Sequence, residues 1–191
     1  MAAGIRSTPA PGEAVLSGTV STNANGKFTI LALPSGVYLL CSNVPSAVYL
    51  DSCTWGRAVR VSVSAGAIAS ASLVLQKGVY LNVRVNDPQG LLPHVVDGPW
   101  TPRKLLVGVA YGTGAYQAAG NTAVDSAGRS YQLIIPAGKP FSLWLYSTDI
   151  ALLDANGIAL AGPTAGIPFQ ASSGQDQTFT FIIAGSVIHA Q

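Results

Sequence analysis

A pattern that occurs twice constrains the fold of this chain more than any other feature. Residues 23–40 read NANGKFTILALPSGVYLL, and residues 125–143 read DSAGRSYQLIIPAGKPFSL. Each copy has a polar turn, an alternating strand with an aromatic residue, a Pro-x-Gly turn and a second alternating strand. The offset of about a hundred residues predicts two copies of one small β domain. The matched positions are Gly26 and Gly128, Phe28 and Tyr131, Pro34 and Pro136, Gly36 and Gly138, and Tyr38 and Phe141.

Turn chemistry and alternation divide the 191 residues into four parts. Residues 1–12 are small, proline-bearing and without period, so we expect an extended arm. Residues 13–76 and 77–185 hold short alternating strands between Gly, Pro, Asn and Asp turns, which predicts an all-β fold of two tandem antiparallel β-sandwiches. Residues 186–191 form a tail. The strands expected in the first domain are 13–21, 28–33, 37–41, 59–63 and 71–75.

The charge content is unusually low and narrows the class of protein. Charged residues make up 9% of the chain and hydrophobic residues 49%, whereas an ordinary soluble domain has roughly 25% charged residues. No stretch approaches the roughly 20 apolar residues of a transmembrane helix. A net charge of +2 without clustered Lys or Arg gives no case for nucleic acid. Either the surface is polar through Ser, Thr, Asn and Gln, or another subunit covers an apolar part of it in a homo-oligomer or larger assembly.

The two cysteines point to an oxidising compartment. A disulfide between Cys41 and Cys53 would close a loop of about a dozen residues and contribute about 3 kcal/mol by the chain-entropy relation. The alternatives are two free thiols or a metal site, but a metal needs further ligands, and His94 and His189 lie in distant segments. The disulfide predicts an extracellular or cell-surface protein. Residues 1–14 lack the apolar core of a signal peptide, so we expect a trimmed leader or another export route.

The sequence offers no set of catalytic, metal or cofactor ligands. Most carboxylates are turn residues: Asp87, Asp125 and Asp154 each precede a glycine three positions later. Capping of a turn by the side-chain oxygen is favoured there over calcium binding, because no D-x-D-x-D-G loop is present. A Gly-x-Ser-x-Gly nucleophile motif is also missing, and neither histidine lies in a setting that predicts a triad. We therefore expect a protein that is not an enzyme and uses no cofactor.

The first copy resembles the carboxypeptidase regulatory-like family. The resemblance is carried by residues 25–30 (NGKFTI) and 33–40 (LPSGVYLL), which match that family's G-x-F-x-F/I strand, L-P-x-G turn and Y-x-L strand. It implies a seven-stranded sandwich of the transthyretin or prealbumin type, similar to the B repeats of collagen-binding adhesins. It covers residues 13–76 well and residues 77–185 loosely. It implies a stalk, accessory or adhesion module and no particular activity.

One departure from the family concerns the first strands. Members usually begin with an I-x-G-x-V strand and then a second strand before the N-G-x-F turn. Here only residues 13–21 clearly precede that turn, and Ile5-Arg6-Ser7 makes a poor first strand. A sandwich that lacks an edge strand exposes unpaired backbone groups. Either the N-terminal arm folds back in cis, or a strand from a neighbouring subunit fills the gap by β-augmentation.

These features predict an extracellular bacterial structural or interaction protein that self-associates through strand addition or an apolar face. The main alternative is a carbohydrate- or peptide-binding module, with the loop tryptophans Trp55 and Trp100 as ligand contacts. A tryptophan that covers the open end of a small sandwich is the competing interpretation of both residues. A third hypothesis is an accessory domain of a secreted enzyme.

Overall fold

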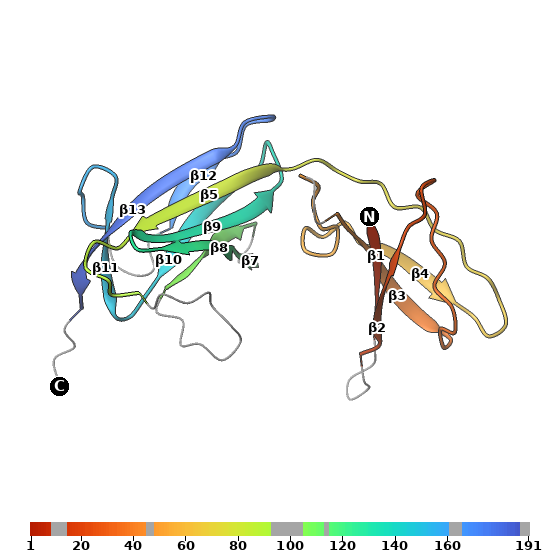
Figure 1. Cartoon of the computed structure of the whole chain (residues 1–191). Coiled ribbons are helices and arrows are strands. Elements are labelled where there is room, and N and C mark those ends of the chain that lie inside the picture. Colours follow the sequence, from red (N-terminus) through yellow and green to blue (C-terminus); the bar gives the residue numbers. More distant parts are fainter. Residues whose placement is uncertain (9–14, 45–47, 93–104, 113–114, 161–165, 188–191) are drawn as a thin grey trace. The chain divides into compact units, whose positions relative to one another are not determined.

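The chain is all-β, as the alternation predicted, and it divides into two compact units. The computed structural model describes residues 1–8, 15–44, 48–92, 105–112, 115–160 and 166–187 (Figure 1). Unit 1 is Met1–Gly78 and unit 2 is Val79–Gln191, so the division falls two residues after the expected one. Across these described ranges, no helix has the length and apolar character that crossing a bilayer requires.

The described strands of unit 1 form one antiparallel sheet in the order β2-β1-β3-β4. The sheet has one apolar face, on which Ile5, Tyr38 and Leu40 are buried. Tyr38 also donates a hydrogen bond through its hydroxyl to the Pro34 carbonyl oxygen at 2.8 Å, which fastens the Pro-x-Gly turn to the core. The strands are β1 (Ala2–Ser7), β2 (Ser17–Ser21), β3 (Gly36–Asn43) and β4 (Val59–Val63).

The prediction of an extended arm was wrong for residues 2–7, which form strand β1 in the interior of the sheet. β1 pairs antiparallel with β2 on one side and β3 on the other, and Ile5 lies opposite Leu40 and Gly18. The arm therefore pairs within its own chain. Gly4, Arg6 and Ser7 give this segment a weak strand signal, but cross-strand pairing and burial of Ile5 outweigh local propensity. Residues 9–12 of the expected arm lie outside the described residues.

Two expected strands of unit 1 are not strands in the structure. Residues 28–33 and 71–75 form no ladder with any described residue (Figure 1). Ala32 has a φ of 57°, which takes the backbone out of the β region and ends the first extended run. The inward direction predicted by alternation holds for four side chains, which pack against the buried cluster: Phe28, Ile30, Leu33 and Leu73. It is wrong for Ala71, which is exposed.

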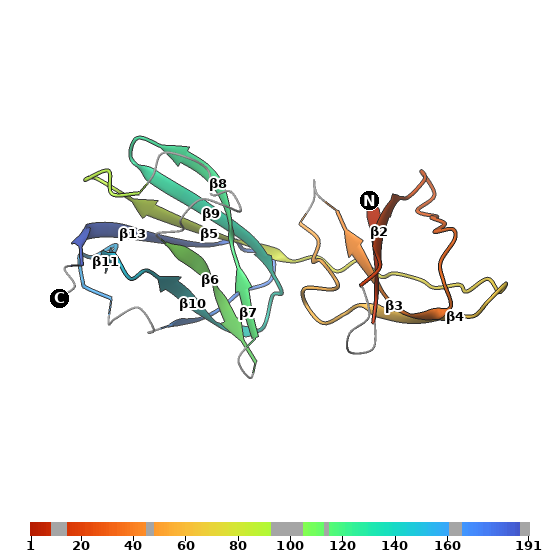
Figure 2. The same ribbon diagram turned by 90° about the horizontal axis from the view of Figure 1, so that it is seen from below.

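Unit 2 has two sheets, with strand orders β12-β10-β6-β7 and β11-β13-β5-β9-β8. Figure 2 shows β6, β7 and β10 in one layer and β5, β8, β9 and β13 in the other. The strands are β5 (Val79–Asn86), β6 (Leu106–Tyr111), β7 (Ala115–Ala118), β8 (Gly120–Asp125), β9 (Gly128–Ile135), β10 (Pro140–Tyr146), β11 (Ile150–Asp154), β12 (Ile167–Gln170) and β13 (Gln177–Ser186).

Strand β5 is the middle strand of the five-stranded sheet. It pairs antiparallel with β9 and parallel with β13, so one ladder departs from the expected purely antiparallel pattern. Its inward side chains are fully buried: Leu81, Val83 and Val85 are 0%, 1% and 0% exposed. The turn into β9 needs glycine, because Gly128 has a φ of 144° and a Cβ there would collide with the Val85 carbonyl oxygen.

We predict that Ile5→Ala destabilises unit 1 by about 2–5 kcal/mol, because it removes one of the few buried side chains of a small core. Arg6→Ala is the matched control, since Arg6 is exposed on the same strand, and it should change the stability by less than about 0.5 kcal/mol. Urea unfolding followed by circular dichroism measures both. Equal stabilities of the two variants would contradict the placement of β1 inside the sheet.

Candidate functional site

The predicted disulfide is confirmed: Cys41 on β3 is bonded to Cys53, with Cα atoms 5.2 Å apart. Two buried serines beside it fasten the same loop, because the Ser42 backbone N–H donates to the Ser52 hydroxyl oxygen at 2.8 Å. One carboxylate oxygen of Asp51 accepts hydrogen bonds from the backbone N–H groups of Cys53 and Thr54. The loop that ends at Cys53 is therefore held to β3 by the disulfide and by the hydrogen bond between Ser42 and Ser52.

The structure describes one of the two candidate tryptophans, Trp55. Trp55 is half-buried in the turn after the disulfide, where its backbone N–H donates to the Asp51 carbonyl oxygen at 3.2 Å. Trp100 lies outside the described residues, as do His94 and His189. A ligand site built on Trp55 and Trp100 thus stays a prediction. Within the described ranges, no three His, Cys, Asp or Glu side chains cluster in a way that could hold a metal ion.

Asp87, Asp125 and Asp154, which the sequence predicts to cap turns, all accept hydrogen bonds from backbone N–H groups of their turns. Asp87 is buried, and its two carboxylate oxygens accept from the backbone N–H groups of Leu91 and Leu92 at 3.0 and 2.7 Å. Asp125 accepts from the Ala127 N–H at 2.8 Å. Asp154 accepts from two backbone N–H groups in the turn after β11. These contacts agree with the role that the spacing to the following glycine predicted.

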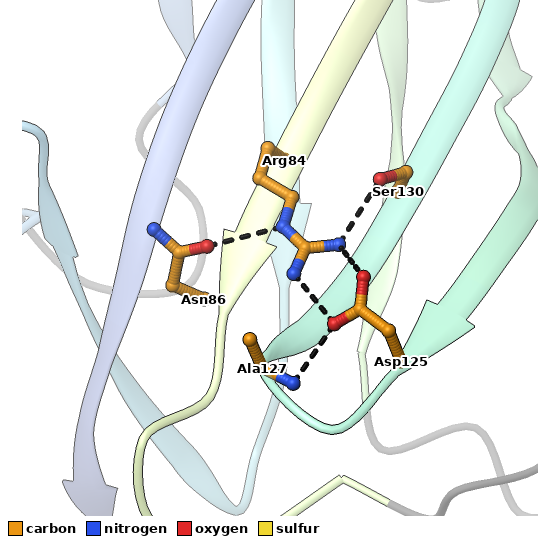
Figure 3. Close-up of polar contacts among 5 residues, drawn as sticks. All are labelled: Arg84, Asn86, Asp125, Ala127 and Ser130. Atoms are coloured by element: carbon orange, nitrogen blue, oxygen red, sulfur yellow. Dashed lines mark hydrogen bonds and ion pairs between the residues drawn. The ribbon is translucent and has the colours of Figure 1, made fainter.

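A polar network crosses the outer face of the five-stranded sheet (Figure 3). Arg84 on β5 makes a bidentate pair with Asp125 at the end of β8, with N–O distances of 2.9 and 2.8 Å. The Arg84 Nε donates to the Asn86 side-chain oxygen at 3.1 Å, and another guanidinium nitrogen donates to the Ser130 hydroxyl at 3.2 Å. Four donor contacts thus fix the guanidinium across three neighbouring strands.

The charges of Arg84 and Asp125 are paired with each other within the network. The hydrogen bond from Arg84 is the largest cause that lowers the pKa of Asp125 to about 2, and the backbone bond from Ala127 adds to it. The same contact raises the pKa of Arg84. A carboxylate held this way stays ionised at neutral pH and is a poor general acid or base. The network therefore links β5, β9 and β8 and offers no catalytic group.

Sequence reasoning missed this network, although it had identified Asp125. The partners Arg84 and Asp125 are 41 residues apart in the chain. Their meeting depends on the register of β5 against β9, in which Arg84 lies opposite Ser130 and Asn86 opposite Gly128. The only sequence signal was the alternation of VYLNVRVN, which places Arg84 and Asn86 on one face.

The best candidate for a functional surface is the second layer of unit 1, which we call the open layer and define as residues 28–33 and 68–75. It covers the apolar face of the sheet, yet no described hydrogen bond involves its backbone. Three large apolar side chains point away from the core: Leu31, Ile68 and Val74 are 79%, 96% and 85% exposed. Such a surface is suited to pairing with another chain.

Charge does not protect the open layer from such pairing. No charged residue occurs between Lys27 and Asp51 or between Arg60 and Lys77, which are the stretches that contain its two segments. Natural edge strands are commonly blunted by lysine, by proline or by a covering element. The open layer itself contains none of these charged or proline residues. The geometry thus places unpaired backbone and uncovered apolar side chains on one surface.

Comparisons with known proteins do not narrow the function. No protein-family model, curated protein or solved structure matches this chain. A functional argument has to come from the sites themselves, because a β-sandwich serves many unrelated roles.

Titration of Asp125 should show an apparent pKa of about 2 by NMR of its side-chain carboxyl. The folded pKa lies below the ordinary aspartate value of 3.8, so the ion pair stabilises unit 2 above about pH 4 and loses this effect as the pH falls towards 2. Arg84→Gln should move the pKa back towards 3.8, while Arg57→Gln in unit 1 should leave it unchanged. A pKa that stays at about 2 in Arg84→Gln would show that the guanidinium is not the main cause.

Removal of the disulfide should lower the unfolding free energy of unit 1 and leave that of unit 2 unchanged. The double variant Cys41→Ser, Cys53→Ser should lose about 3 kcal/mol of unfolding free energy, because the unfolded chain is no longer cross-linked. Denaturant unfolding measures the loss, and a reducing agent should produce a similar loss in the wild type. The reducing agent should have no effect on the double variant. An unchanged midpoint for unit 1 after reduction would argue against a stabilising role.

Proposed function

We propose that the protein is a non-enzymatic structural or interaction protein of the cell exterior, and that it self-associates by strand addition at unit 1. The observation that carries this proposal is the open layer, in which two extended segments lie over the core of unit 1 without a hydrogen-bonded neighbour. The backbone groups of these segments are accessible and have no described protein partner, so an incoming strand can pair with them.

The magnitudes suit a reversible association. Burial of a large apolar side chain contributes about 1.5–3 kcal/mol, so the three exposed residues of the open layer would contribute about 5–9 kcal/mol together. Association costs roughly 4–15 kcal/mol in lost translational and rotational freedom. Each interchain backbone hydrogen bond adds about 0.5–1.5 kcal/mol. The balance predicts a complex that depends on protein concentration.

The remaining parts of the proposal rest on the disulfide and on sequence. The bond between Cys41 and Cys53 supports an oxidising compartment, as outside a bacterial cell. The resemblance to the carboxypeptidase regulatory-like family supports an adhesion, stalk or accessory role. The alternative of a glycan- or peptide-binding module with Trp55 and Trp100 has less support, because Trp55 is half-buried within a fastened loop.

Lysine substitutions on the open layer should abolish self-association. We predict that the double variant Ile68→Lys, Val74→Lys stays monomeric over a concentration series in which the wild type grows in mass, because a partner strand would have to cover two charged side chains. Ile158→Lys is the matched control: it also replaces an exposed isoleucine, at 65% exposure, but lies in unit 2. Size-exclusion chromatography with light scattering measures the mass of each protein.

Two results would contradict the proposal. A wild-type chain that remains monomeric at every concentration would overturn self-association as the main role. A double variant that assembles as the wild type does would show that another surface is responsible. Circular dichroism of each variant confirms that the comparison is made between folded proteins.

A further inference from the structure

The four-stranded sheet of unit 2 turns aromatic side chains away from the core. On β10 the buried residues alternate with residues that point outwards, and the outward set includes Trp144 and Tyr146. Tyr116 on β7 lies opposite Ala110 of β6, which lies opposite Ser142 on β10, so Tyr116 shares that outer face. Tyr116 and Tyr146 are 47% and 42% exposed, and Trp144 is half-buried. We call Trp144, Tyr146 and Tyr116 the aromatic face.

Two glycines make room for rings of the aromatic face. A Cβ atom at Gly108 would lie 2.6 Å from the hydroxyl oxygen of Tyr116 and 2.7 Å from its Cζ, so the phenol passes over Gly108. A Cβ atom at Gly166 would lie 2.8 Å from Nε1 of Trp144 and 3.0 Å from its Cε2. Side chains of a sheet ordinarily stand roughly perpendicular to it. These two rings instead occupy the space just above glycine backbone, where they form a low platform and not a ridge.

The strands that carry the aromatic face are uncharged. β6, β7, β10 and β12 contain no Asp, Glu, Lys or Arg. The outer face of the five-stranded sheet differs, because it carries the ion pair of Arg84 and Asp125 and a hydrogen bond from the Gln132 amide to the Asn82 side-chain oxygen. An ionic ligand would lose its hydration on these four strands without gaining a counter-charge. The aromatic face therefore suits a neutral ligand, and it offers nothing to the phosphates of a nucleic acid.

The size of the aromatic face suits a ligand smaller than a folded protein. Its sheet has four strands, which are four to seven residues long. At about 4.8 Å between strands and about 3.3 Å per residue, the face covers roughly 300 Å². A stable interface between two proteins takes about 800 Å² from each partner. The face is thus too small to hold a second copy of the chain by itself, whereas a linear neutral ligand fits it.

We propose that the aromatic face is a binding site for a neutral saccharide chain. A sugar ring presents C–H groups on its apolar side, and the negative face of an aromatic ring attracts them. The hydroxyls of Tyr116 and Tyr146 can donate to and accept from the sugar hydroxyls at the rim. Trp144 and Tyr146 are two residues apart on β10, about 7 Å along the strand, so both can contact one saccharide chain. The site lies in unit 2 and adds ligand binding to the self-association proposed for unit 1.

The experiment applies the full chain to an array of neutral and acidic oligosaccharides and then titrates it with the neutral hexasaccharides that bind. Binding should be saturable and confined to neutral sugars. Trp144→Ala and Tyr116→Ala should each weaken it about tenfold, because each removes one stacked ring. Trp144→Phe keeps a ring at that position and should retain more affinity than Trp144→Ala. Tyr80→Ala is the matched control and should change the affinity by less than about twofold, since Tyr80 is a half-buried tyrosine of β5 in the other sheet.

Three outcomes would overturn the inference. One is that no neutral sugar of the array binds, and another is that acidic sugars bind equally well. The third is sugar binding that Trp55→Ala abolishes and Trp144→Ala leaves intact, which would place the site on the loop of unit 1. Urea unfolding of each variant shows that a loss of binding is not a loss of fold. Light scattering keeps the two proposals apart, because Trp144→Ala should lose sugar binding and still self-associate as the wild type does.

Discussion

The hydrogen-bonding requirement of an extended backbone is the constraint on which the rest of this structure depends. Each residue of a β layer carries an N–H and a C=O that need partners once they are removed from water. In unit 2, β5 meets this requirement for its neighbours β9 and β13, and its apolar side chains fill the core at the same time. In unit 1 the two segments of the open layer cover the core through Phe28, Ile30, Leu33 and Leu73, with their backbone groups unmatched among the described contacts.

Local chemistry explains why parts of this fold could be predicted from the sequence. The Asn23 turn and the Asp125 turn use the same device, a side-chain oxygen that accepts from a backbone N–H two residues later. The inward direction of Phe28 and Tyr38 follows from alternation, and the Cys41–Cys53 bond follows from spacing. Each of these features is decided within about a dozen residues, where propensity and geometry act directly.

Features that depend on distant parts of the chain were missed. Strand β1 has little propensity of its own, and only its pairing with β2 and β3 makes it a strand. Conversely, residues 28–33 alternate well but have no strand beside them among the described residues, so the pattern alone could not make a ladder. The Arg84–Asp125 pair needed the register of β5 against β9. Alternation in the sequence indicates which face of a strand a side chain occupies. Hydrogen-bonded pairing depends instead on which strand the fold places beside it.

The difference between the two units has a consequence for how their stabilities respond to concentration. Unit 2 has its middle strand β5 within its own chain, so the pairing of β9 and β13 with β5 does not depend on protein concentration. If a second copy pairs with the open layer, as the proposed function states, the stability of unit 1 includes a binding term and rises with protein concentration. The disulfide at Cys41 acts against this dependence, because it stabilises unit 1 whether or not a donor is bound. The cross-link thus stabilises the unit whose described second layer lacks hydrogen-bonded pairing, whereas β5 completes that pairing in unit 2 without one.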